Sequence, residues 1–176
     1  MKHEPEAPIT PSFRSGTKKL LTQMALALIK NKTMSYVKVM IHAVWGTKNR
    51  EHLITKDVRQ VLLTHIRENA KQKEIFIDTI NSQPDHVHCL FGLNADMALS
   101  KALNLIKGES SFWMNKQKLI SFKFEWADDY FAASVSESQV DKVKQYILNQ
   151  DEHHRKISFT EEYNKFLVSY GYNIQG

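Results

Sequence analysis

The chain has 176 residues, 42% of them hydrophobic, and its single cysteine excludes an internal disulfide framework and is typical of a reducing compartment. No apolar stretch reaches the roughly 20 residues that cross a membrane, so we expect a globular cytoplasmic protein. The formal net charge is +5, but residues 1–33 carry +4 of it and residues 34–176 only +1, so the main part of the chain is not basic overall.

The first 33 residues differ from the rest. The segment EPEAPITPSF (4–13) holds three of the four prolines and predicts disorder, whereas KKLLTQMALALIKNK (18–32) has the pattern of a short amphipathic helix. Met34 directly precedes a strand pattern, which makes it a candidate alternative start. We interpret residues 1–33 as a disordered or weakly helical N-terminal extension and residues 34–176 as a single domain.

Four strands and two helices are predicted in the first part of this domain. The strand patterns are rich in β-branched and aromatic residues, and the helices have apolar residues at helical spacing. The strands are expected at 36–46, 75–83, 86–93 and 124–135, the last one bent, and the helices at 57–73 and 97–117. The resulting order, β-α-β-β-α-β, is that of ferredoxin-like folds, in which the third strand is central and lies beside the first.

Two further helices are expected at the C-terminal end, over residues 136–155 and 158–171. Each begins with the serine and the Gln or Glu of a capping box, and Gly171 is a natural end for the second. The predicted fold class is therefore α+β, a ferredoxin-like sheet with two additional C-terminal helices.

The stretch SQPDHVHCLFGL (82–93) places two histidines at the start of the third strand. Residues i and i+2 of a strand share a face, so His86 and His88 project together while Val87 and Cys89 project the other way. We expect the apolar set to pack under the helices and both imidazoles to lie on the open face of the sheet. Taken alone, such a pair also fits a half-buried strand that merely tolerates histidine.

The helix expected at 136–155 carries polar side chains that complement this pair. Tyr146 and Gln150 are four residues apart and share one helix face, and His153 continues the same strip. The strip flanks an apolar stripe of Val140, Val143 and Ile147. A helix docked by that stripe would hold a phenol and an amide carbonyl at the edge of its contact surface, although a lone tyrosine there is more often a packing residue.

This combination of residue types suits phosphoryl transfer through a covalent tyrosine intermediate. Tyrosine is a weak nucleophile at neutral pH because its pKa is near 10. A divalent metal held by two imidazoles and one carbonyl oxygen can polarise a phosphodiester and leave open positions for it. A phosphotyrosine ester stays reactive, so a later 3′-hydroxyl can reverse the attack without ATP.

Five stretches resemble the HUH single-tyrosine transposases of small bacterial insertion sequences and their relatives associated with repetitive extragenic palindromes. They are HAVWGTKNRE (42–51), QPDHVHCLFGL (83–93), LIKGESSFWMNK (105–116), QYILNQDEHHRK (145–156) and FTEEYNKFLVSYG (159–171). The joint occurrence of His-x-His and Tyr-x-x-x-Gln in this order is specific, whereas His-x-His alone is not.

The resemblance implies a DNA transposase that acts on single strands. It places the metal ligands at His86, His88 and Gln150 and the nucleophile at Tyr146, which would form a 5′-phosphotyrosine and release a 3′-hydroxyl. It further implies Mg²⁺ or Mn²⁺, imperfect hairpins at the ends of a mobile element as the recognised DNA, and a homodimer. In such dimers the tyrosine helix of one subunit often completes the partner's active site in trans, and the sequence leaves open whether Tyr146 serves its own subunit or its neighbour.

Basic and aromatic residues outside this motif are candidates for contacts with DNA. Residues 101–123 hold five lysines against one acid, and a smaller basic cluster lies at 48–50. Together they could follow the backbone of a folded strand, with an aromatic ring stacking on bases. The candidates are Trp45, Lys48, Arg50, Lys101, Lys107 and Lys116, with Phe112 or Trp113 as further rings and His153 as an auxiliary group.

Two other functions remain open at this stage. A non-catalytic module of ferredoxin-like fold would bind single-stranded nucleic acid equally well with and without metal. A nucleotide hydrolase with alternating histidines needs a third histidine on the same face, and position 90 is leucine. A domesticated relative that cleaves DNA without moving its own gene is a variant of the transposase hypothesis.

Overall fold

The computed structural model describes residues 36–153 and 159–172. These residues lie in one compact unit that begins at Val37, apart from Tyr36. The predicted N-terminal extension, with its candidate helix, falls outside the described residues. No helix in the described ranges is long and apolar enough to cross a membrane.

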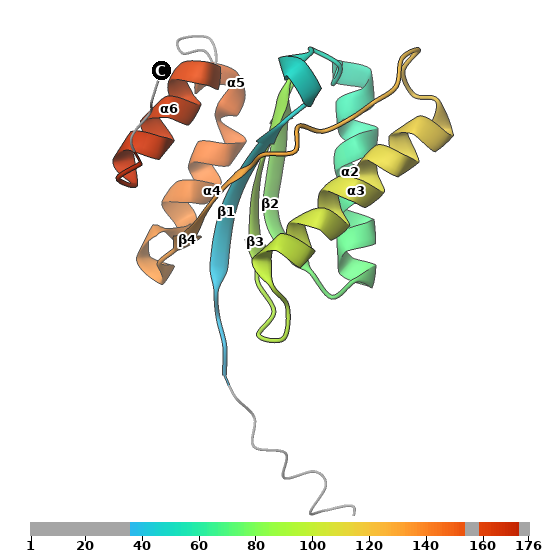
Figure 1. The fold of residues 1–176 in the computed structure, drawn as a ribbon. Helices are drawn as coiled ribbons and strands as arrows, with labels where there is room; N and C mark the ends of the chain where they lie inside the picture. Colours follow the sequence, from blue (N-terminus) through green and yellow to red (C-terminus); the bar gives the residue numbers. More distant parts are fainter. Residues whose placement is uncertain (1–35, 154–158, 173–176) are drawn as a thin grey trace, which may run out of the picture. The chain divides into compact units, whose positions relative to one another are not determined.

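A four-stranded antiparallel sheet forms the centre of the fold (Figure 1). Its strands are β1 (Met40–Gly46), β2 (Phe76–Gln83), β3 (His86–Gly92) and β4 (Phe131–Val135). They lie in the order β2-β3-β1-β4, so β3 is central and pairs with β1 along its whole length. The predicted α+β, ferredoxin-like arrangement is therefore confirmed.

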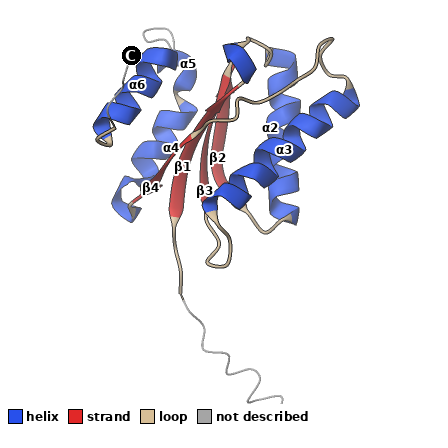
Figure 2. Cartoon of the chain, viewed as in Figure 1, coloured by secondary structure: helices blue, strands red, loops and turns tan. Residues whose placement is uncertain are grey.

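Helices cover both faces of this sheet (Figure 2). The long helices α2 and α3 lie on one face, and three shorter helices, α4, α5 and α6, lie on the other. Their bounds are α2 (Lys56–Gln72), α3 (Leu99–Gln117), α4 (Val140–Leu148), α5 (Gln150–His153) and α6 (Phe159–Ser169), with 3-10 turns η1 (Lys48–Arg50) and η2 (Glu137–Gln139).

The alternation of β3 divides the buried residues between the two faces. Val87, Cys89 and Phe91 belong to the large apolar core under α2 and α3. Leu90 points the other way and meets Ile147 of α4 in a smaller cluster. This cluster also includes Val140 and Val143, so the predicted apolar stripe does dock the first C-terminal helix onto the sheet.

Three predicted elements differ from the observed ones. The first strand, expected at 36–46, begins at Met40. The strand expected at 124–135 begins only at Phe131, because the rings of Phe124 and Trp126 turn into the core and Asn115 hydrogen-bonds both the N–H and the carbonyl of Phe124. The helix expected at 136–155 is divided into η2, α4 and α5, with a break at Asn149. At this break the side chain of Asn81 donates a hydrogen bond to the carbonyl of Ile147 (2.8 Å).

Candidate functional site

His86 and His88 lie side by side in a buried polar cluster between the sheet and the C-terminal helices. Their side chains are 1% and 0% exposed, so the open face expected from the sequence is in fact covered. The covering residues come from α4 and α6, since the ring of Tyr146 lies 5.8 Å from that of His88 and Phe159 stacks on His86 at 4.0 Å. The shared orientation of the two imidazoles agrees with the alternation of β3.

Asp85 orients the first imidazole. Its Oδ1 lies 2.7 Å from Nδ1 of His86, which leaves Nε2 directed toward the cluster. Burial lowers the pKa of His86, although the hydrogen bond to Asp85 and its charge act in the opposite direction. Burial would raise the pKa of Asp85, but its hydrogen bond and charge interaction with His86 outweigh this and bring that pKa below its usual value. A carboxylate on the far nitrogen is the usual support of a metal-ligating histidine.

His42 of β1 orients the imidazole of His88 in the same way. Its Nε2 lies 3.2 Å from Nδ1 of His88, and its side chain is buried. Burial lowers the pKa of His42 to about 4, so this ring is neutral at pH 7. If Nε2 of His88 offers a lone pair to a metal, its proton must be on Nδ1, where it can be donated to His42.

Gln150, the third predicted ligand, reaches the same cluster from the start of α5. It is fully buried, and its Nε2 donates to Oε1 of Glu162 at 3.4 Å. Its Oε1 has no hydrogen-bond partner within the described ranges. The next residue, Asp151, anchors α5 by accepting from Gln83 (2.8 Å) and Arg59 (3.1 Å), so Gln150 is held in place by polar contacts with β2 and α2.

Glu162 of α6 joins the cluster and was not predicted from the sequence. Its Oε2 lies 3.5 Å from Nε2 of His88 and 3.9 Å from Nε2 of His86. Ligand atoms of these three residues all lie within 4.8 Å of one another. Burial and the charge of Asp85 raise the pKa of Glu162 to about 8. Removal of this carboxyl from water therefore favours its protonated form unless a cation compensates the charge.

The residues of the cluster fit a divalent metal. Two imidazoles with Nε2 directed inward, a buried amide oxygen without a hydrogen-bond donor in the described part of the chain, and a carboxylate are all metal-ligating groups. The predicted ligands His86, His88 and Gln150 would hold the ion, and Glu162 is a fourth candidate. The donors are nitrogen and oxygen, which does not select one metal among Mg²⁺, Mn²⁺ and Zn²⁺ by type alone.

Tyr146 lies at the edge of this cluster. Its half-buried ring is 5.8 Å from His88, 6.2 Å from His42 and 6.0 Å from Phe166 of α6. The structure therefore places the tyrosine beside the histidine pair of its own chain. Although a helix break separates them, Tyr146 and Gln150 both reach the cluster, as their spacing predicts.

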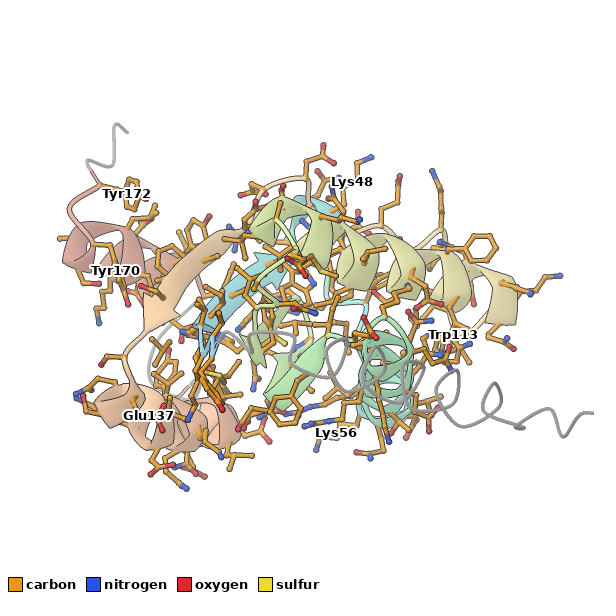
Figure 3. All side chains as sticks on the ribbon, turned by 90° about the horizontal axis from the view of Figure 1, so that it is seen from below. Lys48, Lys56, Trp113, Glu137, Tyr170 and Tyr172 are labelled. Carbon is orange, nitrogen blue, oxygen red and sulfur yellow. The ribbon has the colours of Figure 1, made fainter. Side chains whose placement is uncertain are left out.

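Three of the predicted DNA-contacting lysines lie on the surface, and the arginine lies near the cluster. Lys48 (Figure 3), Lys101 and Lys116 are exposed, and Lys48 pairs with Glu125 at 3.2 Å. The guanidinium carbon of Arg50 lies 4.0 Å above the ring of Phe159 in α6. Nη1 of Arg50 is buried, and no described residue accepts a hydrogen bond from it.

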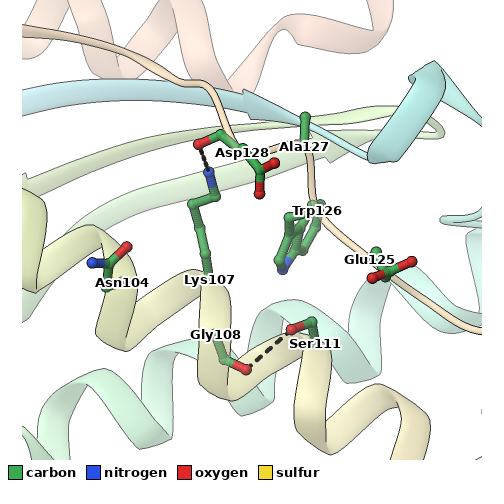
Figure 4. Close-up of a pocket in the computed structure, with 8 residues that line it drawn as sticks. All are labelled: Asn104, Lys107, Gly108, Ser111, Glu125, Trp126, Ala127 and Asp128. Atoms are coloured by element: carbon green, nitrogen blue, oxygen red, sulfur yellow. Dashed lines mark hydrogen bonds between the residues drawn. The ribbon is translucent and has the colours of Figure 1, made fainter.

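Two residues proposed for the DNA surface are buried. Trp45 is 1% exposed and packs edge-on against Trp126, so its ring is not available to bases. Lys107 is also buried, because its amine donates to the carbonyls of Asp128 and Asp129 at 3.1 and 3.2 Å. It lines a cavity of about 370 Å³ between α3 and residues 125–128 (Figure 4). For both residues the expectation of a surface role is wrong, because packing and backbone carbonyls take up their side chains.

The remaining candidates are placed only in part. Phe112 is exposed, whereas Trp113 turns toward α2 and stacks on His65 at 3.9 Å (Figure 3), so one ring of the pair is available, as expected. His153 ends α5, and its side chain lies outside the described residues.

Three residues of the site were missed by sequence reasoning: His42, Asp85 and Glu162. Asp85 directly precedes the His-x-His motif, and an acid at that position could have been recognised as a support for His86. His42 lies on the strand that pairs with β3, on the face that holds Leu90 and His88, so the strand register could have indicated it. Glu162 gave no comparable signal, because its contact depends on how α6 docks.

Comparisons with known proteins agree with this fold and motif. The model of a family described as IS200-like transposases matches residues 35–150. The chain therefore belongs to the IS200-like transposase family, and the resemblance to single-tyrosine transposases is confirmed. It is 28% identical over 137 residues to the ISDra2 transposase TnpA of Deinococcus radiodurans, covering 74% of this chain and 97% of that protein. It is 25% identical over 114 residues to the IS200 transposase of Salmonella typhimurium, covering 62% and 74%.

Solved structures agree with the assignment. A crystal structure of a Deinococcus radiodurans R1 protein described as a transposase is similar with a TM-score of 0.55 and 26% identity, over 68% of this chain and 97% of that one. A tyrosine transposase associated with REP sequences, solved with a REP hairpin bound, has a TM-score of 0.54 and 18% identity, over 72% and 75% of the two chains. The second likeness concerns the fold alone.

Proposed function

We propose that this transposase cleaves and rejoins single-stranded DNA at the hairpin ends of a mobile element, with Tyr146 as the nucleophile. Family membership makes the protein a transposase and hence an enzyme that cleaves DNA. The observation that supports the finer proposal is the position of the Tyr146 ring beside the buried cluster of His86, His88 and Gln150. A non-catalytic binding module would have no need of a phenol at that place.

The proposed chemistry is a reversible exchange of phosphodiester bonds. The phenol of Tyr146 loses its proton, its oxygen bonds to phosphorus, and the bond from phosphorus to the 3′ oxygen breaks. The 3′ oxygen takes up a proton, and the 5′ phosphate remains on the tyrosine. The bond energy is kept in the phosphotyrosine ester, so another 3′-hydroxyl can attack it and join the strands without a nucleotide cofactor.

In this proposal the metal is Mg²⁺ or Mn²⁺, held by His86, His88 and Gln150. When bound, it would neutralise charge on the phosphate oxygens and make the phosphorus more electrophilic. Asp85 and His42 keep the two imidazoles in the tautomer and orientation that direct Nε2 to the metal.

The DNA would be held by the exposed cations and recognised through its hairpin shape. Lys48, Lys101 and Lys116 can contact phosphates, and Phe112 can stack on an unpaired base. The similar REP-associated transposase was solved with a hairpin, which supports this choice of substrate. We further propose that the protein acts in the cytoplasm as a homodimer. Tyr146 lies beside His88 of its own chain, so completion of the partner's site would require the tyrosine helix to be exchanged between the two subunits.

A labelled hairpin oligonucleotide from the DNA that flanks the gene tests the nucleophile. With Mn²⁺, the wild-type protein should form a covalent adduct that survives a denaturing gel. Tyr146→Phe should abolish the adduct and still bind the hairpin. Tyr130→Phe is the matched control, because Tyr130 packs near Lys107 on the far side of the sheet, and it should form the adduct normally.

Each part of the proposal can fail separately. An adduct that persists in Tyr146→Phe would falsify the assignment of the nucleophile. Adduct formation that survives both EDTA and His88→Ala would remove the metal from the mechanism. Equal binding of a hairpin and an unstructured strand of the same composition would contradict recognition through shape.

A further inference from the structure

The cluster contains one carboxylate that the proposed reaction does not use. Glu162 is 3% exposed and contacts three proposed ligands: Nε2 of His88 (3.5 Å), Nε2 of His86 (3.9 Å) and Nε2 of Gln150 (3.4 Å). The other three side chains are neutral when they act as ligands, so Glu162 supplies the only negative charge among these four. A bound divalent cation would draw this carboxylate toward it.

Glu162 is held there by the aromatic face of α6. Phe159, Glu162 and Phe166 are three and four residues apart, so they share one side of the helix. Phe159 stacks on His86 at 4.0 Å, and Phe166 meets the edge of His42 at 5.6 Å. The two rings therefore fix α6 over the cluster on both sides of the carboxylate.

We propose that Glu162 is a fourth metal ligand of the DNA-free protein and occupies the place that the DNA phosphate takes in the reaction. The inference rests on the proposed function, since it concerns the same metal. A carboxylate and a phosphodiester each carry one negative charge on two equivalent oxygens, so either can complete the coordination of a divalent ion. A site with three neutral protein ligands keeps a position open for substrate, whereas a fourth protein ligand closes it.

The position of Arg50 gives this exchange a second consequence. Its guanidinium lies against Phe159 at 4.0 Å and is 5.4 Å from the ring of Tyr163, both of them on α6. A shift of α6 that carried Glu162 away from the metal would carry Phe159 with it. The guanidinium of Arg50 would then be uncovered and could pair with a DNA phosphate.

Metal binding without DNA tests the ligand role directly. Mn²⁺ is titrated into the full-length protein and followed by calorimetry or by the electron paramagnetic resonance signal of the free ion. Glu162→Gln should weaken Mn²⁺ binding about tenfold or more, and Glu162→Ala should do the same. Glu161→Gln, an exposed neighbour with the same charge, is the matched control and should bind as the wild type does.

The outcome separates this inference from the proposed function. If both Glu162 variants bind Mn²⁺ within twofold of the wild type while His88→Ala does not bind, Glu162 is not a ligand, and the metal site stands. If the wild-type protein itself does not bind Mn²⁺, the metal-dependent function fails with it. Circular dichroism and thermal melting identify any variant whose fold has changed, and the two Glu162 variants serve as checks on one another.

A second titration tests the exchange with phosphate. Both proteins compared here carry Tyr146→Phe, so that the DNA is not cleaved, and one of them also carries Glu162→Gln. Mn²⁺ binding to each is measured in the presence of a saturating hairpin oligonucleotide that the wild type cleaves. The defect of Glu162→Gln should then shrink to twofold or less, because the phosphate replaces the carboxylate. A tenfold defect that persists with DNA would show that Glu162 stays on the metal and would overturn the exchange.

Discussion

The two faces of the sheet are built from different kinds of residue. The face under α2 and α3 is a continuous apolar core that includes Val87, Cys89 and Phe91 of β3. The face under α4, α5 and α6 has two small apolar clusters, and between them lie buried polar side chains. These are His42, His86, His88, Gln150 and Glu162. Alternate residues of β3 therefore have different roles, since one set packs in the apolar core and the other set contributes to the polar cluster.

This difference indicates that folding and chemistry are largely separated in the molecule. Apolar burial on the first face contributes most of the stability, at about 25 cal/mol per Å² of apolar surface. The second face depends on hydrogen bonds and ion pairs that dock α4 and α5 on β2, and such contacts have smaller net energies. A substitution on one face of the sheet should therefore leave the other face largely unchanged.

The largest expected effect on stability comes from truncating the apolar face. Phe91→Ala should lower the free energy of unfolding by about 3–5 kcal/mol, because Phe91 is fully buried and leaves a cavity. His88→Ala, on the same strand but facing the other side, should cost only about 1–2 kcal/mol and yet abolish the adduct. Denaturation in urea measures both. Equal costs for the two variants would contradict the separation of roles.

Two buried groups of the polar face should respond to acid in opposite directions in the metal-free protein. Burial lowers the pKa of His42 from 6.5 to about 4, so the unfolded chain binds a proton at pH 5 that the folded chain does not. His42 therefore costs stability as the pH falls from above 6.5 toward 4, about 2 kcal/mol at pH 5. The pKa of Glu162 is raised to about 8, so the folded chain holds a proton there that the unfolded chain lacks, and this group adds stability over the same range. The free energy of unfolding in EDTA at pH 7 and pH 5, compared between the wild type and His42→Gln, isolates the loss caused by His42.

His42→Gln should remove the loss caused by His42, since the substituted side chain does not titrate, so the change in stability from pH 7 to pH 5 should be about 2 kcal/mol more favourable than in the wild type. His52→Gln, at a position whose side chain is 75% exposed, is the control and should leave the dependence as it is in the wild type. A wild-type pH dependence in His42→Gln would mean that other groups cause the acid effect.

The docking of α4 should depend on Asn81 of β2. Its side chain donates to the carbonyl of Ile147 (2.8 Å) and accepts from Arg59. Asn81→Ala should cost about 1–3 kcal/mol and increase amide hydrogen exchange in α4 more than in α2 or α3. Asn94→Ala, at an exposed position after β3, is the control. Uniformly faster exchange across the molecule would mean that the two faces do not open separately.

The smallest expected effect comes from the ion pair between α4 and β2. Lys144 Nζ lies 3.1 Å from Asp78 Oδ1, and the lysine side chain is partly exposed. Lys144→Ala should lower the free energy of unfolding by less than about 1 kcal/mol, and by less still in 1 M salt. Unfolding curves at low and high salt test this. A loss comparable to that of Asn81→Ala would assign the docking of α4 to charge rather than to the hydrogen bond.

Much of the fold follows from local patterns. The alternation of 86–92, the helical spacing of 56–72 and the apolar stripe of α4 depend on neighbouring residues. The first two were predicted with bounds close to those observed, and the stripe was predicted correctly within a helix that is longer than α4. The errors arose where distant contacts override local preference. Phe124 and Trp126 have strand-forming side chains, but the core and Asn115 hold them in a loop instead.

By itself, the sequence determined the order of the elements and the pair of motifs that characterise the family. His86 and His88 share a face because a strand alternates. Tyr146 and Gln150 were placed on one side by the 3.6-residue repeat of a helix, and they do reach the same cluster although α4 ends at Leu148 and α5 begins at Gln150. Only the tertiary structure decided that the supposedly open face is covered, that Trp45 and Lys107 are buried, and that His42 and Glu162 join the site. These facts depend on strand pairing and helix docking, which bring together residues that are far apart in the chain. Such contacts cannot be recognised from the local sequence around each residue.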